Sequence, residues 1–300
     1  MIKLEDFPNV KGSLEANAPL NKKSFFGAAG RAEFLFKPAD MDDLVFFLRG
    51  MPKGLKITPL GMLSNVLIRS GGIDGVVVIL GDWFKKSFIE ENVLEVGAGL
   101  SCSQLSTIAM DHELGGFEFL MGLPGTIGGA IKMNAGCFGS EICDVLIECE
   151  TITSNGNVKW FKAKDIAASY RKSEIPDDSI ITRAWFKGVQ NVRYSIPKKV
   201  REIMDMRSAA QPKGVLTCGS TFKNPEGMKA WKLIEDAGCR DMRVGDAHLS
   251  EKHCNFIVND GDATPEDIEN LGDKIAQTVL EKTGVQLEWE IIKLGKMNSE

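Results

Sequence analysis

The stretch GLPGTIGGAIKMNAG, residues 122–136, contains five glycines and a proline, and Lys132 is its only charged residue. Because glycine destabilises the interior of both helices and strands, this stretch cannot form one regular element along its whole length. Closely spaced glycines let backbone N–H groups reach phosphate oxygens where any Cβ would obstruct them. PLGMLSN, residues 59–65, contains one glycine, Gly61, and is a second stretch that could present bare backbone to a ligand. Alternatively, these glycines only form turns and allow close packing.

Neither stretch matches a standard nucleotide-binding fingerprint. The sequence contains no GxxxxGK[ST] motif, and no GxGxxG lies between a predicted strand and a helix with an acidic residue downstream. The glycines alone therefore do not decide whether a cofactor binds here.

The composition is that of a folded chain with more than one core. Its 300 residues, 43% hydrophobic and 26% charged, favour two or three domains. A net charge of -5 argues against nucleic-acid binding through bulk electrostatics. Seven scattered cysteines without a CxxC pair favour a reducing compartment over a disulfide framework or a zinc ribbon. We see no signal peptide and no apolar run near the roughly 20 residues that span a bilayer, so we expect a cytoplasmic protein with no membrane association.

Alternating strand and helix patterns predict an α+β protein. Helices are expected over residues 40–50, 101–116, 197–212 and 263–284, and strands within 64–81 and over 92–99. Residues 144–161 predict a hairpin that turns at Asn155 and Gly156.

The C-terminal elements carry the clearest patterns. In the helix over 263–284, Thr264 is the expected cap, Pro265 occupies the first turn and Gly284 ends the helix. Its apolar stripe consists of Ile268, Leu271, Ile275 and Val279. VQLEWEII, residues 285–292, predicts a strand that places Glu288 and Glu290 on one face.

Four stretches follow one another in an order known from one enzyme family. GFEFLMGLPGTIGGAIKMNAGCFGSEI, SYRKSEIP, CGSTFKNP and VGDAHLSEKHCNFIVN resemble successive motifs of the UDP-N-acetylenolpyruvoylglucosamine reductases. The resemblance extends from about Ser24 to Gly295. It implies two FAD-binding α+β subdomains of the vanillyl-alcohol-oxidase type, expected at residues 1–78 and 79–198, and an α+β substrate-binding domain at 199–300.

The resemblance also implies the activity. Members of the family are FAD-dependent oxidoreductases that reduce UDP-N-acetylglucosamine enolpyruvate to UDP-N-acetylmuramate with NADPH, in peptidoglycan precursor synthesis. We therefore expect FAD bound without a covalent link and NADPH as the hydride donor. The expected partners are the two small-molecule substrates, UDP-N-acetylglucosamine enolpyruvate and NADPH, and we expect a monomer. The spacing between Arg171 and Ser220 is short, and the only tyrosines are Tyr170 and Tyr194. In both respects the chain resembles the compact type of the family, which lacks a tyrosine loop.

Three residues match the catalytic positions of the family. Arg171 would bind the substrate carboxylate, because a guanidinium presents a rigid, permanently charged fork. Ser220 would donate a proton. Glu290 would be the partner of the enolate system, with Glu288 as the second choice. Without the resemblance, Arg171 would be read as a surface arginine, Ser220 as part of a turn, and the two glutamates as a solvated face.

The resemblance implies further contacts as well. The residues expected to bind the cofactor are Gly61, Ser64, Asn65, Pro124, Gly125, Thr126, Ile127, Gly128, Gly129, Asn134, Ala135 and Gly136. Those expected to bind the substrate are Tyr170, Lys223, Asn224, Lys252, His253 and Asn255, where a structural role for His253 is an equal alternative. No residues have the spacing of a metal site.

The sequence departs from the family pattern at several positions. Gly27 stands in place of an arginine, Ala29 and Leu63 in place of glycines, Trp289 in place of a proline and Ile292 in place of an arginine, although Lys293 follows. Because a Cβ at residue 63 would obstruct a phosphate, we predict weakened FAD affinity.

Two other functions stay open. One is another oxidoreductase of the same flavin fold, such as a sugar or lactone oxidase. Those enzymes often attach FAD to a histidine in the N-terminal glycine loop. The only histidines here are His112, His248 and His253, so covalent attachment in that loop is excluded. The other is a degenerate relative that binds flavin or a UDP-sugar without turnover.

Overall fold

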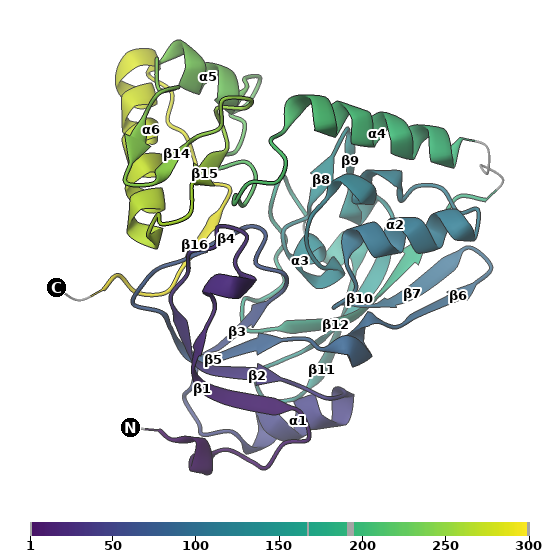
Figure 1. Ribbon diagram of the computed structural model, residues 1–300. Coiled ribbons are helices and arrows are strands. Elements are labelled where there is room, and N and C mark those ends of the chain that lie inside the picture. Colours follow the sequence, from purple (N-terminus) through teal and green to yellow (C-terminus); the bar gives the residue numbers. More distant parts are fainter. Residues whose placement is uncertain (1, 167, 191–194, 299–300) are drawn as a thin grey trace. The chain divides into compact units, whose positions relative to one another are not determined.

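The computed structural model describes residues 2–166, 168–190 and 195–298, so that Tyr194 lies outside the described residues (Figure 1). The chain divides into two compact units. Unit 1 consists of Met1–Ala16, Phe34–Gly61 and Gly75–Arg207, and unit 2 of Asn17–Glu33, Met62–Asp74 and Ser208–Glu300.

A four-stranded sheet has the order β1-β2-β5-β3. Its strands are β1 (Ser13–Pro19), β2 (Arg31–Lys37), β3 (Ile57–Leu60) and β5 (Ile73–Ile79), and the chain between β2 and β3 forms helix α1 (Met41–Gly50). The expected helix over residues 40–50 is confirmed: the Asp40 side chain caps it by accepting from the Asp43 N–H, and Leu44, Phe47 and Leu48 are buried. Phe36 stacks on Phe47 at 3.9 Å between ring centroids, within an apolar core of unit 1.

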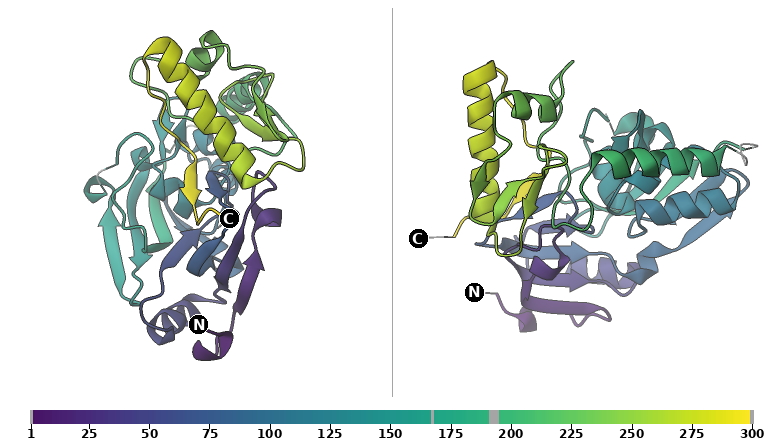
Figure 2. Two further views of the ribbon diagram at one scale, coloured as in Figure 1. Left: turned by 90° about the vertical axis from the view of Figure 1, so that its left-hand side faces the viewer. Right: turned by 45° about the horizontal axis from the view of Figure 1, so that its top comes forward.

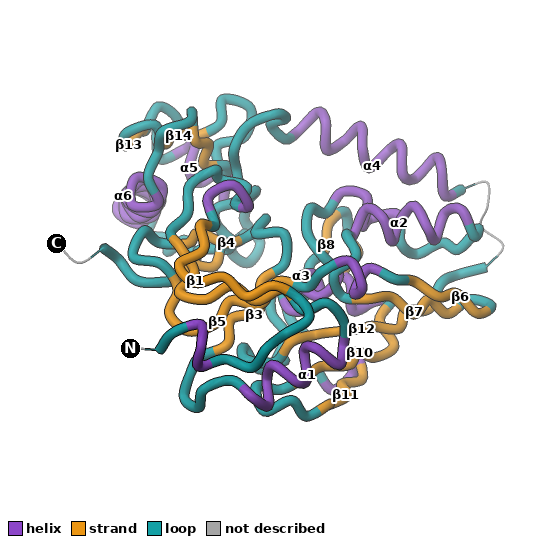
Figure 3. The backbone as a smooth tube through the Cα atoms, turned by 60° about the horizontal axis from the view of Figure 1, so that its bottom comes forward, coloured by secondary structure: helices purple, strands orange, loops and turns teal. Residues whose placement is uncertain are grey.

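The second sheet of unit 1 has the order β11-β10-β12-β7-β6. Its strands are β6 (Ser87–Glu90), β7 (Val93–Gly97), β10 (Leu146–Ile152), β11 (Val158–Lys162) and β12 (Ile180–Lys187), all paired antiparallel. Helices α2 (Cys102–Asp111) and α3 (Ile127–Lys132) cover one face of this sheet (Figures 1 and 3). Helix α4 (Ile196–Ala210) follows, and β8 (Gly136–Cys137) and β9 (Ser140–Glu141) form a short hairpin.

The local patterns in unit 1 predict the structure well. The hairpin between β10 and β11 is confirmed, and Gly156 adopts the left-handed conformation that its turn requires, with φ +72°. The strand prediction for residues 92–99 is also confirmed by β7. The helix expected over 101–116 ends earlier, at Asp111, because Glu113 turns to φ +60° and the Leu114 N–H bonds the Ala109 carbonyl.

Unit 2 is built around helix α6 (Pro265–Thr283). It packs on the three-stranded sheet β13 (Arg243–Val244), β14 (Ala247–Leu249) and β15 (Ile257–Asn259), as Figure 2 shows with α6 in yellow beside green strands. Helix α5 (Ala230–Asp236) also contacts α6, and β4 (Val66–Ile68) pairs in parallel with β16 (Ile292–Leu294). The prediction of α6 is confirmed in detail: Thr264 forms a capping box with Asp267, the expected stripe is fully buried, and Gly284 ends the helix with φ +73°.

The strand expected over residues 285–292 is wrong in extent. Only Ile292–Leu294 form a strand, and residues 285–291 run extended with a single bridge between Trp289 and Phe222. The expected alternation of side chains does hold, because Leu287 and Ile291 are buried while Gln286 and Glu288 are exposed. Among the described residues, no helix is long and apolar enough to cross a membrane.

Candidate functional site

The candidate residues fall into two groups, one in each unit. Unit 1 holds the glycine-rich stretch and Arg171, and unit 2 holds Ser220 and Glu290.

The glycine-rich stretch wraps around the start of helix α3. The Thr126 Oγ1 accepts from the Gly129 N–H at 3.3 Å and caps the helix, which explains why a helix of only six residues forms among glycines. Gly61 lies directly against this cap, since a Cβ at residue 61 would come within 2.5 Å of Thr126 Oγ1. The two glycine loops that the sequence singled out, 59–65 and 122–136, therefore meet at Gly61 and Thr126.

The same stretch pairs with the segment after β7. The N–H groups of Ile127 and Gly128 donate to the carbonyls of Leu100 and Ala98 at 2.8 and 2.9 Å. The N–H groups of Gly125 and Thr126 have no hydrogen-bond acceptor among the described residues. Unused amides beside residues without side chains fit a cofactor phosphate or a flavin ring edge, because both offer acceptors.

Arg171 occupies a tight turn with an unusual backbone. Ser169 and Lys172 exchange hydrogen bonds of 2.9 and 3.0 Å, so Tyr170 and Arg171 form the tip of the turn. Arg171 has φ +59°, a left-handed conformation that costs a non-glycine residue about 1–2 kcal/mol. Its Nη2 donates to the Gly136 carbonyl at 2.9 Å, and its guanidinium lies 4.8 Å from the Tyr170 ring centroid. The turn is thus joined to the glycine-rich stretch.

Asn134 provides the second connection between these segments. Its buried amide donates to Oε2 of Glu141 at 2.6 Å and to the Ser169 carbonyl at 3.1 Å. Its Oδ1 accepts from the Cys143 N–H at 3.4 Å. The side chain that we expected at the cofactor is therefore engaged with the protein itself and supports the turn that carries Arg171.

Arg207, in α4, was not singled out by the sequence patterns. No hydrogen bond or ion pair of its guanidinium is found within the described residues. Burial lowers the pKa of Arg207, and burial raises the pKa of Cys137 to about 11 although Arg207 and Arg171 oppose this effect. Two arginines therefore lie near one thiol beside the glycine-rich stretch. Nothing in the sequence around Arg207 distinguishes it from a surface arginine of a charged helix.

In unit 2, the segment around Ser220 is the middle one of three extended segments. The Thr221 N–H donates to the Asn255 carbonyl at 2.7 Å, and the Thr221 carbonyl accepts from the Glu290 N–H at 2.8 Å. Ser220 itself bridges to Phe256. Thr221, directly after Ser220, therefore joins this segment to those of Asn255 and Glu290, which lie about 35 and 70 positions further along the chain.

The Asn255 amide clamps this arrangement. Its Oδ1 accepts from the Phe222 N–H at 3.0 Å and its Nδ2 donates to the Phe222 carbonyl at 2.8 Å, so both polar groups are occupied. His253 Nδ1 accepts from the Asn255 N–H at 3.3 Å, and burial lowers the pKa of His253, so that its ring is neutral at pH 7. The Nδ1 atom of His253 is therefore engaged within the protein.

The remaining polar candidates also have partners within the protein. Lys223 forms an ion pair with Glu288 at 3.3 Å, Asn224 Oδ1 accepts from the Ala230 N–H at 3.0 Å at the start of α5, and Lys252 Nζ donates to the Ser208 carbonyl at 2.5 Å. The hydroxyl of Ser220, in contrast, has no hydrogen-bond partner among the described residues.

Asn65 connects the second glycine loop to Glu290. Its Nδ2 donates to the Glu290 carbonyl at 3.1 Å, and its own carbonyl accepts from the Ile292 N–H at 3.0 Å. Leu63, two residues earlier, is buried with φ +55°, so its side chain turns away from the surface while its backbone keeps a glycine-like conformation. This orientation weakens the reason for expecting Leu63 to obstruct a phosphate.

The departure at Gly27 has a structural counterpart. Gly27 has φ +70°, and a Cβ at this position would approach Leu216 Cδ1 to 2.8 Å. An arginine would therefore be strained here by its positive φ and would displace the Leu216 side chain, so glycine is the residue that fits this backbone without strain.

Sequence models of known domains match most of the chain. Residues 32–162 match the model described as an FAD binding domain, and residues 211–294 match the C-terminal domain of UDP-N-acetylenolpyruvoylglucosamine reductase. Together with the glycine loops, these matches make the chain an FAD-dependent oxidoreductase of α+β fold.

Full-length relatives agree. The chain is 44% identical over 292 residues to a UDP-N-acetylenolpyruvoylglucosamine reductase of Parvibaculum lavamentivorans, covering 97% of this chain and 94% of that protein. It is also 44% identical over 289 residues to one of Rickettsia akari, covering 96% and 98%. The crystal structure of the enzyme from Thermus caldophilus superposes with a TM-score of 0.83 at 30% identity, covering 96% of this chain and 100% of that one. The chain belongs to the UDP-N-acetylenolpyruvoylglucosamine reductase family.

Proposed function

We propose that this chain reduces UDP-N-acetylglucosamine enolpyruvate to UDP-N-acetylmuramate with NADPH and bound FAD, and that Arg171, Ser220 and Glu290 are its catalytic residues. The match to full-length reductases at 44% identity supports the reaction. The observation that carries the residue assignment is the Thr221 carbonyl, which joins the Ser220 segment to the Glu290 backbone at 2.8 Å.

The three side chains have complementary tasks in this proposal. Arg171 binds the carboxylate of the enolpyruvyl group, where negative charge accumulates during reduction. Ser220 delivers a proton to the carbon that bears this carboxylate, and its unpartnered hydroxyl is available for that transfer. Glu290 is the acid–base partner of the enolate. Glu288 is less suited, because its side chain is 72% exposed.

FAD, when bound, supplies hydride transfer between NADPH and the substrate. We propose that the protein holds it without a covalent bond, through the glycine loops and the residues expected there. The unpaired amides of Gly125 and Thr126 are the donors that fit it best. The amides of Asn65 and Asn134 act differently in this proposal, because both already bond the protein and so shape the loops.

We propose that the substrate is bound by Tyr170, Lys223, Asn224, Lys252, His253 and Asn255, either directly or through the segments that they hold. Asn255 belongs to the second kind, since its amide is occupied by the Phe222 backbone. Lys223 and Lys252 carry the positive charges that a diphosphate requires.

We further propose a cytoplasmic monomer that serves peptidoglycan synthesis and, through it, cell shape and division. The functional division of the chain in this proposal is FAD-binding subdomains at 1–78 and 79–198 and a substrate-binding domain at 199–300. One apolar core, formed by residues between Leu94 and Phe186, lies wholly within the second range and supports that subdomain.

An absorbance experiment tests the function. The purified protein should be yellow, lose its colour with NADPH under anaerobic conditions, and recover it when UDP-N-acetylglucosamine enolpyruvate is added. Recovery only with oxygen would point to another oxidoreductase of this fold. Colourless protein that takes up no FAD would support the degenerate relative. Ser220→Ala should still bleach with NADPH but recover its colour at least about 10²-fold more slowly, the usual contribution of a positioned proton donor.

A further inference from the structure

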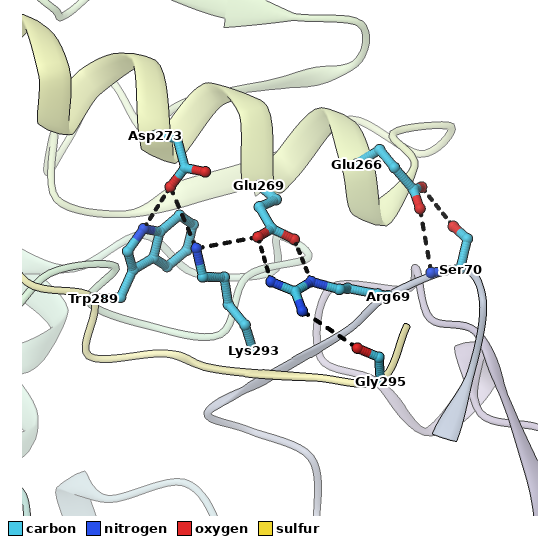
Figure 4. A network of polar contacts seen from close by, with 8 residues as sticks. All are labelled: Arg69, Ser70, Glu266, Glu269, Asp273, Trp289, Lys293 and Gly295. Carbon is cyan, nitrogen blue, oxygen red and sulfur yellow. Dashed lines mark hydrogen bonds and ion pairs between the residues drawn. The ribbon is translucent and has the colours of Figure 1, made fainter. Parts of the chain in front are cut away.

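Trp289, the residue before Glu290, is anchored by its side chain (Figure 4). Its indole N–H donates to Oδ1 of Asp273 at 2.9 Å, and Lys293 Nζ lies 4.6 Å from its ring centroid. The ring also lies directly against helix α6, because a Cβ added at Gly272 would come within 2.2 Å of it. Three groups therefore restrict how Trp289 can move.

The anchor is itself part of a larger network on one face of α6 (Figure 4). Lys293 pairs with Asp273 at 3.4 Å and with Glu269 at 3.1 Å. Glu269 is 4% exposed and receives two hydrogen bonds of 2.8 Å from Arg69. Asp273, whose side chain is 55% exposed, thus lies at the solvent-facing end of a connected chain of charges.

The backbone at Trp289 is held differently from its neighbours. The Lys223 N–H donates to the Glu288 carbonyl at 2.9 Å, and the Glu290 N–H donates to the Thr221 carbonyl. In such an antiparallel bridge the residue between these two bonds does not use its own N–H and carbonyl, and its side chain packs against the residue opposite. That residue is Trp289, whose ring lies 5.4 Å from the Phe222 ring between centroids.

From this geometry we propose that Trp289, fixed by Asp273, is a positioning residue that sets the place of the Glu290 carboxyl. The inference rests on the proposed role of Glu290. Hydrogen bonds hold the backbone on both sides of Trp289, at the Glu288 carbonyl and the Glu290 N–H, and the Trp289 side chain holds this backbone against α6. A shift of the segment after loss of that side-chain contact would move the Glu290 carboxyl, and a misplacement of about 1 Å can cost about 10²-fold in rate.

The same pairing indicates which side chains can occupy position 289. A proline, with its fixed φ and no N–H, would keep the ladder intact and restrain the backbone covalently. Trp289 provides the restraint through packing and one hydrogen bond instead. The proposal therefore predicts that proline can replace tryptophan here, whereas alanine cannot.

The test measures the two half-reactions of the holoenzyme separately, by flavin absorbance under single-turnover conditions. Trp289→Phe keeps the ring and removes the indole donor, and Asp273→Ala removes the acceptor. Each should slow oxidation of the reduced enzyme by the enolpyruvyl sugar about fivefold, the effect of one lost hydrogen bond, and leave bleaching by NADPH unchanged. Trp289→Pro should be faster than Trp289→Ala. Lys274→Ala, an exposed change on α6 next to Asp273, is the matched control and should alter neither half-reaction.

A double-variant comparison shows whether Trp289 acts through Glu290. In an E290Q background, Trp289→Phe and Asp273→Ala should cause no further loss, because no carboxyl remains to be placed. Equal losses in both backgrounds, or unchanged oxidation rates in the single variants, would overturn the inference. If E290Q alone oxidises at the normal rate, the assignment of Glu290 in the proposed function fails, and the inference fails with it.

Discussion

Replacing Glu269 by glutamine tests how much the charge network of α6 stabilises the protein. Glu269 is 4% exposed, receives two 2.8 Å hydrogen bonds from Arg69 and lies 3.1 Å from Lys293. The substitution keeps the volume but leaves two partly buried cations facing a neutral amide. Removal of one partner from a buried ion pair typically costs about 3–5 kcal/mol. Because the side chains of Arg69 and Lys293 are 28% and 24% exposed, solvent reduces the cost, and we expect about 2–3 kcal/mol.

The remaining partners of the two cations support the lower figure. Arg69 keeps the Gly295 carbonyl at 3.3 Å, and Lys293 keeps Asp273 at 3.4 Å. Urea denaturation monitored by circular dichroism measures the free energy of unfolding. The control is Asp82→Asn, which breaks an ion pair with Lys85 at 2.7 Å whose aspartate is 95% exposed, and it should cause no measurable change. If Glu269→Gln destabilises the protein no more than Asp82→Asn, the reasoning from burial is refuted.

Three further predictions follow from named contacts. Hydrogen bonds from Arg69 hold the pKa of Glu269 below its usual value, so its charge adds stability above the unfolded pKa of 4.5, and this stability is lost as the pH falls through the folded pKa. The free energies of unfolding of the wild-type protein and Glu269→Gln should therefore converge below pH 4.5, and a constant difference between them at all pH values would contradict this. Leu63→Gly should relieve about 1–2 kcal/mol of left-handed strain but lose about 2–5 kcal/mol of buried side chain, a net loss of stability in urea denaturation, and a gain would show that strain dominates. Thr126→Ala removes the cap of α3, at a cost of about 1 kcal/mol, and should weaken FAD binding in a reconstitution titration, whereas unchanged affinity would separate the cap from the cofactor site.

Local patterns predicted the elements whose stabilising contacts lie within the element. Helix α6 is the clearest case, because Thr264, Pro265 and Gly284 are read directly from neighbouring positions and the apolar stripe needs only the helical period. The extended segment 285–291 shows the limit. Alternation correctly gave the buried side chains, but it cannot show that only one bridge, to Phe222, is formed. A ladder depends on a partner about 65 positions away, and the sequence carries no sign of where that pairing stops.

The resemblance singled out candidate residues, but residue type did not show which group each side chain bonds. Asn65, Asn134 and Asn255 were each expected to contact a ligand. In the structure their amides bond the Glu290 carbonyl, the Ser169 carbonyl and the Phe222 backbone, respectively. An amide offers two donors and an acceptor and suits either use, so residue type alone cannot distinguish a ligand contact from a backbone clamp.

These three side-chain amides have the same structural role, since each holds two distant segments together, and this role accounts for their place in the motifs. Asn134 joins the stretch after α3 to the turn of Arg171, Asn255 joins its own segment to the residues after Ser220, and Asn65 joins the second glycine loop to Glu290. Each therefore links a segment that carries a proposed catalytic residue to another segment far away in the sequence. Loops and short extended segments have few backbone partners of their own, so a buried amide that bonds a distant carbonyl is an effective way to fix them. Replacing any of the three by aspartate should therefore misplace the neighbouring proposed catalytic residue, because the carboxylate turns a donor into a second acceptor facing a carbonyl.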